Sequence, residues 1–452
     1  MTAKIQVEQM KPASGIPHWS IAARIAFRFS FVYLGLFIVY FCPLWLQDLL
    51  FIKKQSHLVL GGIWPMRQTV FWAGTHIFRM TASPDPGVGY DGSFFWVQAF
   101  CLLIISLVAS GIWSVLDRRR ENYVTLHKWL RLVIRFVLAA LMFAYGMFKV
   151  IPAQMPHPTL FQLVRPFGHF LQMEVLWAYM GAALSYEIFA GCAELLGGIL
   201  LLIPRTATFG ALVCLADLTN VFVIDMSYNV ANKLQVFHFL LLCMFLLAPE
   251  FSRLANFFVL NRAAPPSSQP QFFRTLLANR IAMGAQVVLA TYLLGANVYA
   301  TWTNYWLAYA DGAPKPVLYG IWDVDQFSMD GEVRPPLLTD NGRFRRVIFD
   351  KGIIWELNSI STDDGAAGFQ RPDDSLAYYH ASINVRDKTL TLTNPDPDPS
   401  RKEWKARFTF ERPALNQLIL DGEMDKHKLH LQLHLLDRKK FGLVSSGFHW
   451  VQ

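Results

Sequence analysis

The chain has little charge and few cysteines. Only 16% of its 452 residues are charged, whereas a soluble globular protein carries roughly 25% charged residues. Its five cysteines form no CxxC pair, and none of them follows residue 310. These absences argue against a disulfide-stapled domain and against CxxC thiol chemistry. The sequence also lacks a haem-attachment CxxCH and a glycine-rich nucleotide loop, which weakens an enzymatic interpretation.

Hydrophobic residues dominate the amino-acid composition. They make up 53% of the chain, and the aromatic residues alone make up 14%. The first 310 residues contain long apolar runs, whereas the last 140 or so resemble an ordinary soluble domain. Residues 1–20 are polar, and the first apolar run is long enough to stay in the membrane, so no cleavable signal is expected. The composition therefore predicts a membrane protein with a smaller soluble domain.

Seven apolar runs are long enough to cross a bilayer as helices. A helix needs about 20 apolar residues to span the hydrocarbon. The sixth run is short, and Pro204 is expected to break the chain between the fourth and fifth runs. The predicted spans are 25–49, 94–116, 132–152, 183–203, 208–226, 234–249 and 281–304.

Basic residues predict the orientation of these spans. The segments on one side, namely the N-terminus, 117–135, the turn at Arg205 and 250–280, hold 15 Lys and Arg. The loops 50–92, 153–182 and 227–233 on the other side hold 6. The more positive side is cytoplasmic. The N-terminus is therefore expected in the cytoplasm and the C-terminal domain in the periplasm of a bacterial inner membrane.

The net charge of +8 does not indicate nucleic-acid binding. Lys and Arg lie mainly in short segments that flank the apolar runs, where they set membrane orientation. The lipid bilayer is the expected partner.

Two loops on the less basic side are more than simple connections. Segments 58–78 and 158–180 are apolar, aromatic and interrupted by Pro or Gly. Each is expected to lie along the membrane interface or to re-enter the membrane. Alternatively, each packs on the helix bundle or covers a site.

From about Ala313 the pattern alternates with a period of two. The segments "KTLTLTN", "WKARFTFER", "KLHLQLHLL" and "KKFGLVSSGFHWV" are expected to be strands, with "DGEMDKHK" as a turn. They predict an antiparallel all-β soluble domain, a small sandwich or barrel. His430 and His434 share one strand face, with His427 and His449 elsewhere in this region, but a solvated strand face needs no metal, and no metal site is expected.

Ionisable residues inside the predicted spans are the candidate functional residues. Glu194 lies near the middle of the fourth span and shares a helix face with Gly191 and Gly198, which favours close contact with another helix. Charged groups at this depth are costly unless they are paired. The natural pairs are Lys149 with Glu194 or Glu187, and Lys233 with Asp225. The full predicted cluster is Tyr145, Lys149, Glu187, Glu194, Asp217, Asn220, Asp225, Lys233 and His238.

Two interpretations of this cluster remain open. It is either a structural ion-pair network that holds the helices in register or a ligand pocket open to the periplasm. No catalytic residue is identified.

Three segments resemble the DoxX family of membrane proteins. They are "YGMFKV" (145–150), "AELLGGILLLIPRTATFGAL" (193–212) and "NVANKLQVFH" (229–238), and the resemblance covers about residues 130–250. It implies a DoxX-like four-helix core and an association with membrane redox complexes, with quinone as the implied cofactor and redox proteins as the implied partners. If the chain is an enzyme, the resemblance implies an oxidoreductase or a subunit of one. The alternative is a non-catalytic scaffold, or a binder or transporter of a small or lipidic ligand.

The expected fold class is thus an α-helical polytopic membrane protein of about seven transmembrane helices plus a C-terminal antiparallel all-β domain. The expected domain boundaries are a cytoplasmic N-terminus (1–24), two spans with an interfacial periplasmic loop (25–128), the DoxX-like core (129–250), a cytoplasmic linker (251–280), the seventh span (281–306) and the β domain (313–452).

Overall fold

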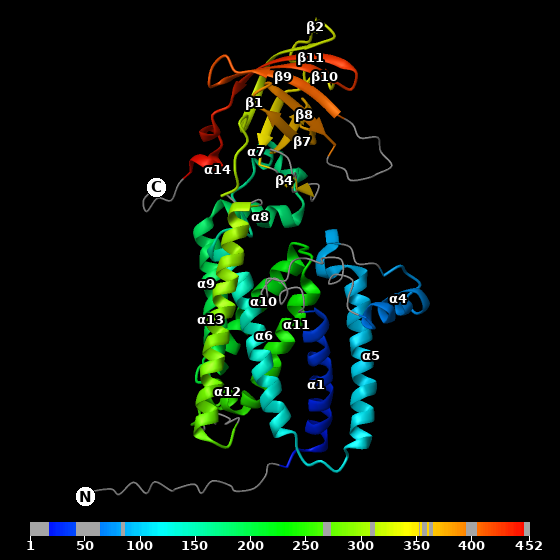
Figure 1. Cartoon of the computed structure of the whole chain (residues 1–452), viewed down its shortest axis with the longest axis vertical. Coiled ribbons are helices and arrows are strands. Elements are labelled where there is room, and N and C mark those ends of the chain that lie inside the picture. The colour runs from blue at the N-terminus through cyan, green and yellow to red at the C-terminus, as the bar shows by residue number, and fades with distance from the viewer. Residues whose placement is uncertain are drawn as a thin grey trace, which may run out of the picture. The chain divides into compact units, whose positions relative to one another are not determined.

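The computed structural model describes residues 18–41, 64–82, 86–264, 273–307, 312–351, 353–354, 359–360, 365–394 and 405–446. Figure 1 shows the course of the chain. The chain divides into two compact units. The first consists of Met1–Leu138 with Phe237–Gly284, and the second of Ala139–Val236 with Ala285–Gln452.

Within the described residues, seven helices are long and apolar enough to cross a membrane, which confirms the polytopic prediction. The sixth is longer than its predicted bounds of 234–249. It begins as α11 (Lys233–Leu247) and continues through η3 (Ala248–Glu250) and α12 (Phe251–Phe258). The seven candidate spans are Ile21–Tyr40, Ser93–Leu116, Val124–Val150, Leu184–Leu202, Ala207–Ser227, Lys233–Phe258 and Leu276–Thr303.

In the first unit, α1 (Ile21–Phe41) packs along α5 (Ser93–Leu116). The predicted end of the first apolar run lies outside the described residues. Of the predicted interfacial loop 58–78, the described part forms α4 (Met66–His76), which packs on α5 and is followed by the short η1 (Pro86–Asp91).

One basic residue that was counted for membrane orientation is buried in this unit. Arg28 is 3% exposed, and its Nε donates to Tyr123 Oη at 2.9 Å. The Tyr123 hydroxyl in turn donates to Asp117 Oδ2 at 2.8 Å. The Arg28 charge therefore links α1 to the connection between α5 and α6 (Val124–Val150).

In the second unit, α9 (Leu184–Leu202) and α10 (Ala207–Ser227) form a tightly packed pair. The chain turns between them at the predicted Pro204 break. A Cβ atom on Gly210 would lie 2.6 Å from the backbone nitrogen of Leu201, so only glycine allows this approach. The least buried span is that of α13 (Leu276–Leu307), which leads to the β domain.

The segment 158–180 forms α7 (Leu160–Val164), η2 (Phe167–His169) and most of α8 (Gln172–Ala182). Thr159 begins α7 with a capping box, in which its side chain accepts from Gln162 N and the Gln162 side chain accepts from Thr159 N. This segment was expected to lie along the membrane interface or to re-enter the membrane, with packing on the bundle or covering a site as the alternatives. Its first helix, α7, packs on the β domain through Phe161 and its neighbours. Its last helix, α8, packs on the bundle, where Leu176 and Met180 cluster with Ala190 of α9 and Ile224 of α10.

The C-terminal domain is an antiparallel eight-stranded β-barrel, which confirms the predicted all-β fold. Strands β1, β3 and β6–β11 follow one another around the wall, and β11 pairs with β1 to close it (Figure 1). The strands are β1 (Gly320–Met329), β2 (Glu332–Val333), β3 (Arg346–Asp350), β4 (Ile353–Ile354), β5 (Ser359–Ile360), β6 (Gly365–Gln370), β7 (Leu376–Asn384), β8 (Thr389–Thr393), β9 (Lys405–Glu411), β10 (Gln417–Met424) and β11 (His427–Leu435).

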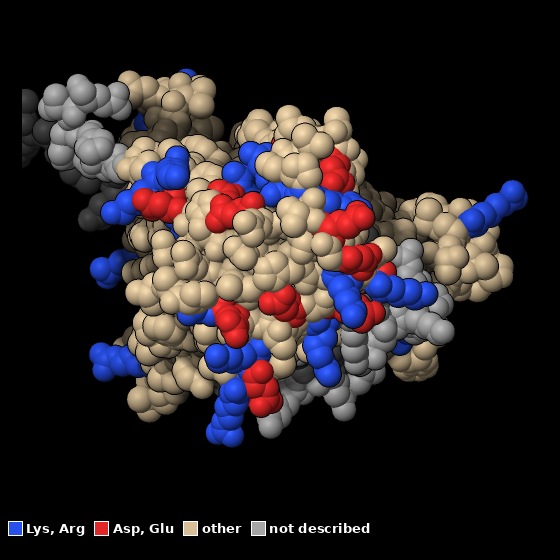
Figure 2. Space-filling view, turned by 90° about the horizontal axis from the view of Figure 1, so that it is seen from above, with Lys and Arg blue, Asp and Glu red and all other residues tan. Residues whose placement is uncertain are grey.

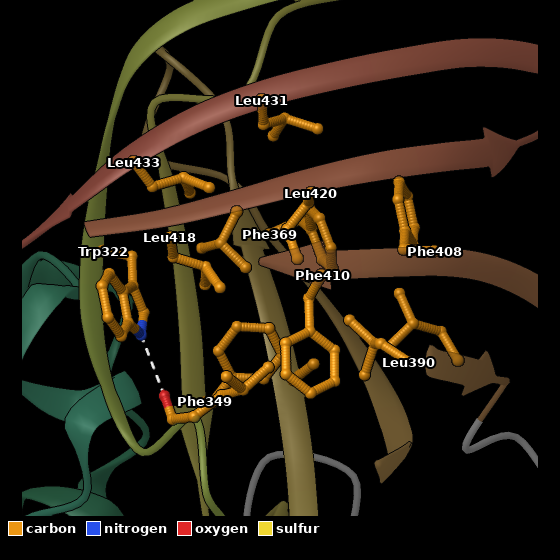
Figure 3. Packing of buried hydrophobic residues seen from close by; sticks show 14 of the residues in the cluster. Trp322, Phe349, Phe369, Leu390, Phe408, Phe410, Leu418, Leu420, Leu431 and Leu433 are labelled. Carbon is orange, nitrogen blue, oxygen red and sulfur yellow. Dashed lines mark hydrogen bonds between the residues drawn. The ribbon is translucent and has the colours of Figure 1, made fainter. Parts of the chain in front are cut away.

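Alternating residues of these strands fill the barrel with a core of leucine, phenylalanine and tryptophan side chains. Figure 3 shows Leu431 and Leu433 of β11 facing this core. Trp322 is fully buried, and its indole Nε1 donates to the Leu318 carbonyl at 2.9 Å, which satisfies the one polar atom of the ring (Figure 3).

Strand β6 is buried on both faces because α7 covers its outer side. Its sequence, "GAAGFQ", shows no alternation, and all six residues are buried. The Phe161 ring lies against Gly368, where a Cβ atom would come within 2.7 Å of it. Gln370 Nε2 donates to the Val164 carbonyl at 3.1 Å. The small residues of β6 therefore make room for α7.

Two details of the strand prediction were wrong. The segment "KKFGLVSSGFHWV" is not a strand in its described part, which forms η5 (Arg438–Lys440) and α14 (Gly442–Ser445). The barrel is already closed by β11, so no ladder position remains for it. The predicted turn "DGEMDKHK" is mostly strand, and the chain reverses at Asp425 and Lys426, both with positive φ, as in tight hairpins.

Candidate functional site

An ion pair between α6 and α9 lies at the centre of the candidate site. Lys149 Nζ donates to both carboxylate oxygens of Glu194, at 2.7 and 2.9 Å. The Lys149 side chain is 9% exposed and that of Glu194 is 4% exposed. The carboxylate in the middle of the apolar α9 sequence is therefore balanced by a cation from the end of α6.

Glycines bring the two helices close enough for this pair to form. A Cβ atom on Gly191 would lie 2.7 Å from the carbonyl oxygen of Gly146 and equally close to Lys149 Cβ. One on Gly198 would lie 2.8 Å from the Phe143 ring. The face predicted from Gly191, Glu194 and Gly198 thus packs directly against α6.

A second carboxylate lies near the pair. Asp217 of α10 is half-buried and interacts electrostatically with both Glu194 and Lys149. Within the described part of the chain, its Oδ2 atom is buried and has no hydrogen-bond partner. The Lys149 ammonium group therefore acts on two carboxylates, Glu194 and Asp217. Because it donates to Glu194, the Asp217 Oδ2 atom remains available to accept a hydrogen bond from a ligand.

Tyr145 connects the α6 side of the cluster to the start of α11. Its hydroxyl donates to Gln235 Oε1 at 2.9 Å and accepts from Asn232 Nδ2 at 3.3 Å. Lys149 Nζ lies 5.8 Å from the centre of the Tyr145 ring. Gln235 and Asn232 were not among the predicted residues, although both lie in "NVANKLQVFH". Two amides in a segment that borders an apolar run were the signal that could have revealed them.

Glu187 is fully buried at the start of α9 and contacts the loop that follows α6. Its Oε1 accepts from Met155 N at 3.1 Å. The structure therefore pairs Lys149 with Glu194, and Glu187 fixes the loop that follows α6.

The remaining predicted residues of the second unit lie along the end of α10 and the start of α11. Asp225 is buried, whereas Asn220 is exposed. Lys233 Nζ donates to Asn229 Oδ1 at 3.2 Å and to the Val230 carbonyl at 2.9 Å. Lys233 therefore caps the turn between the two helices.

His238 contacts α1 in the first unit. Its Nε2 lies 2.8 Å from the Tyr33 hydroxyl. Its ring stacks on Phe37 with centroids 4.5 Å apart and planes 8° apart. These contacts tie His238 to α1, and its membership of the Lys149 cluster, which rested on depth alone, stays a prediction.

The histidines of β11 each face a different carboxylate on the barrel surface. His427 Nδ1 lies 2.7 Å from Asp330 Oδ2, His430 Nδ1 2.5 Å from Asp421 Oδ1, and His434 Nδ1 2.7 Å from Asp325 Oδ1. The hydrogen bond from His427 lowers the pKa of Asp330. His449 lies outside the described residues. Seen from above, the molecule carries Lys and Arg next to Asp and Glu (Figure 2), as is usual for a solvated surface.

Comparison with curated proteins finds a relative of part of the chain. The chain is similar to the uncharacterized protein YwoB of Bacillus subtilis (strain 168), with 30% identity over 113 residues. This match covers 25% of the present chain and 71% of that protein. The chain therefore belongs to the family of that protein. No family model matches the chain, and no solved structure matches it.

Proposed function

We propose that this member of the YwoB family binds the polar group of a small or lipidic ligand at the cluster of Lys149, Glu194, Asp217 and Tyr145 in its helix bundle. The observation that carries the proposal is Asp217 Oδ2, which is buried without a hydrogen-bond partner among the described residues. Ionisable groups inside a membrane bundle are costly and generally mark function. A ligand with a hydroxyl or ammonium group would satisfy this oxygen.

The cluster also supplies donors for such a ligand. The Lys149 ammonium group on α6 and the Asn232 amide just before α11 carry N–H donors, and Asp217 on α10 and Glu194 on α9 carry acceptors. A polar head that both donates and accepts hydrogen bonds fits this combination. The surrounding apolar helices suit a hydrophobic tail.

A more specific form of the proposal follows from the resemblance to the DoxX family. In this form the ligand is a quinone or quinol, and the chain works with redox partner proteins in a bacterial inner membrane. The N-terminus then lies in the cytoplasm and the barrel in the periplasm. Quinone carbonyls accept hydrogen bonds and quinol hydroxyls donate them, so both forms find partners in the cluster.

A structural scaffold is the second candidate function, and the ion pair itself favours it. Lys149 and Glu194 pair directly through two hydrogen bonds, and the glycine contacts on either side fix the register of α6 on α9. In this case the bundle holds the barrel at the membrane, and the cluster binds no ligand.

Three groups of variants separate the two functions. Glu194→Gln leaves Lys149 unpaired and is expected to cost about 3–5 kcal/mol of stability, and adding Lys149→Met should recover much of this loss. Asp217→Asn should leave folding intact but release the ligand. Thr219→Val, at an exposed position of the same helix, is the matched control.

The measurements are a thermal melt in detergent and mass spectrometry of small molecules extracted from each purified variant. A quinone or lipid that co-purifies with the wild type and the Thr219 variant, but not with Asp217→Asn, supports ligand binding. The scaffold function is supported if all stable variants carry the same extracted molecules as the wild type.

A further inference from the structure

A cavity of about 520 Å³ opens between the α6–α7 loop, the end of α8 and the barrel. All of its walls belong to the second unit. It is separate from the Lys149 cluster, since none of the cluster residues lines it.

Basic side chains outnumber acidic ones in this cavity. Lys315, Lys351 and Arg438 line it, and Asp350 is the single carboxylate among the lining residues. Asp350 is 4% exposed and uses both oxygens to accept backbone N–H bonds, from Leu160 at 2.6 Å and Lys351 at 2.8 Å. The open part of the cavity therefore carries a positive potential.

Two of the cations converge on one aromatic ring. Lys315 Nζ lies 4.9 Å from the centre of the Tyr319 ring, and the Arg438 guanidinium carbon lies 5.7 Å from it. Arg438 Nη1 also donates to the Tyr319 hydroxyl at 3.3 Å. Both cations therefore lie beside Tyr319 on the cavity wall, and an anion bound there would be attracted to each of them.

Arg438 retains an unused donor. Its Nε atom is buried and, within the described ranges, has no hydrogen-bond partner. A buried guanidinium N–H without an acceptor is costly. An oxyanion in the cavity would satisfy it, and Thr159 and Ser446 place hydroxyl groups on the same walls.

The cavity lies next to a candidate membrane span. Its wall residue Ala182 is two residues before Leu184, where the fourth span begins, a distance of at most about 7 Å. The polar headgroup layer of a bilayer extends about that far beyond the hydrocarbon. Leu443 and Val444 of α14 also line the cavity and are 56% and 41% exposed. The cavity thus combines cationic walls with the exposed apolar side chains of Leu443 and Val444, at a depth that corresponds to the headgroup layer of the bilayer.

We propose that this cavity binds a phosphate group, with Arg438 and Lys315 as its charged ligands. An anionic phospholipid headgroup and free inorganic phosphate share this chemistry. The apolar edge formed by Leu443 and Val444 favours the phospholipid, whose acyl chains would lie along it.

The full-length protein in detergent provides the test. Retention of phosphatidylglycerol is measured by native mass spectrometry, with phosphatidylcholine as the uncharged comparison. Stabilisation by inorganic phosphate is measured as a shift in Tm against sodium chloride at equal ionic strength. The variants are Lys315→Gln, at an exposed position, and the double change Lys315→Gln with Arg438→Gln. The matched control is Lys439→Gln with Lys440→Gln, which removes the same charge from exposed neighbours that do not line the cavity.

The double variant is expected to retain phosphatidylglycerol about tenfold less than the control, because two charge-assisted hydrogen bonds are lost. Lys315→Gln alone, which leaves Arg438 in place, should show a smaller loss in the same direction. A phosphate-dependent Tm shift that is lost in the same variants, without selective lipid retention, assigns the cavity to free phosphate. Equal lipid retention and equal phosphate shifts in the double variant and the control would overturn the proposal.

Discussion

Asp350 at the end of β3 accepts a hydrogen bond at 2.6 Å from the backbone N–H of Leu160, which lies 190 residues earlier in the chain. Leu160 is the first residue of α7, where backbone N–H groups have no partner within the helix. The carboxylate of the barrel thus caps a short helix of the loop between the third and fourth spans. This contact and the Phe161 side chain beside it fasten the loop to the barrel.

Stability should depend on pH through Asp350. Burial raises the pKa of Asp350 above its ordinary value of 3.8, although the hydrogen bonds from Lys351 and Leu160 oppose the shift. The folded state therefore binds this proton more tightly than the unfolded state, and the contribution of Asp350 to stability falls as the pH rises from 3.8 through the raised folded pKa. Asp350→Asn should reduce the dependence of stability on pH in this range. The check is the Tm of the full chain across this range, and equal slopes in both proteins would contradict it.

Phe161→Ala should loosen the loop from the barrel. Phe161 is fully buried against Gly368 and Tyr378, so its removal should cost about 3–5 kcal/mol locally. Hydrogen exchange should accelerate in 159–164 and in β6. Phe167→Ala, in the same loop but 75% exposed, is the control and should leave exchange unchanged. Unaltered protection in the Phe161 variant would show that α7 does not depend on this contact.

Gly191→Ala should destabilise the bundle. The new methyl group would meet the Gly146 carbonyl and Lys149 Cβ, and overpacking of this kind costs about 1–3 kcal/mol. Gly295→Ala on α13 is the control, because its Cβ atom would meet nothing within 4 Å. That change should be neutral or stabilising by about 0.5–1 kcal/mol, since alanine favours a helix. Thermal melts of both variants are the measurement, and a Tm for Gly191→Ala equal to that of the control would refute close packing.

Thiol labelling tests the membrane orientation that the basic residues predict. In a Cys192→Ser background, Leu415→Cys places a thiol at an 86% exposed barrel position. An impermeant maleimide should label it in cells with a permeabilised outer membrane. Arg119→Cys, between the second and third spans, should react only after lysis. The reverse labelling pattern would place the barrel in the cytoplasm.

Several features of the fold follow from the sequence alone. The seven spans were predictable because a helix must carry about 20 apolar residues to cross the hydrocarbon, and that length is visible locally. The strands β8, β9 and β11 were predictable because alternation with a period of two reports one buried face. The Lys149–Glu194 pair was foreseeable because a buried charge in an apolar helix needs a partner at similar depth.

Other features were decided only by the tertiary structure. Gln235 and Asn232 belong to the cluster because the chain at the start of α11 packs beside Tyr145. No local sequence pattern predicts that contact. His238 stacks on Phe37 of α1, 201 residues away, and no local pattern names that partner. The segment after β11 turns into η5 and α14 because the barrel is already closed. The sequence of strand β6 shows no alternation of apolar and polar residues because α7 covers its outer face. Hydrophobic periodicity reports whether a residue is buried, but the partner that buries it is set by contacts between segments far apart in the chain.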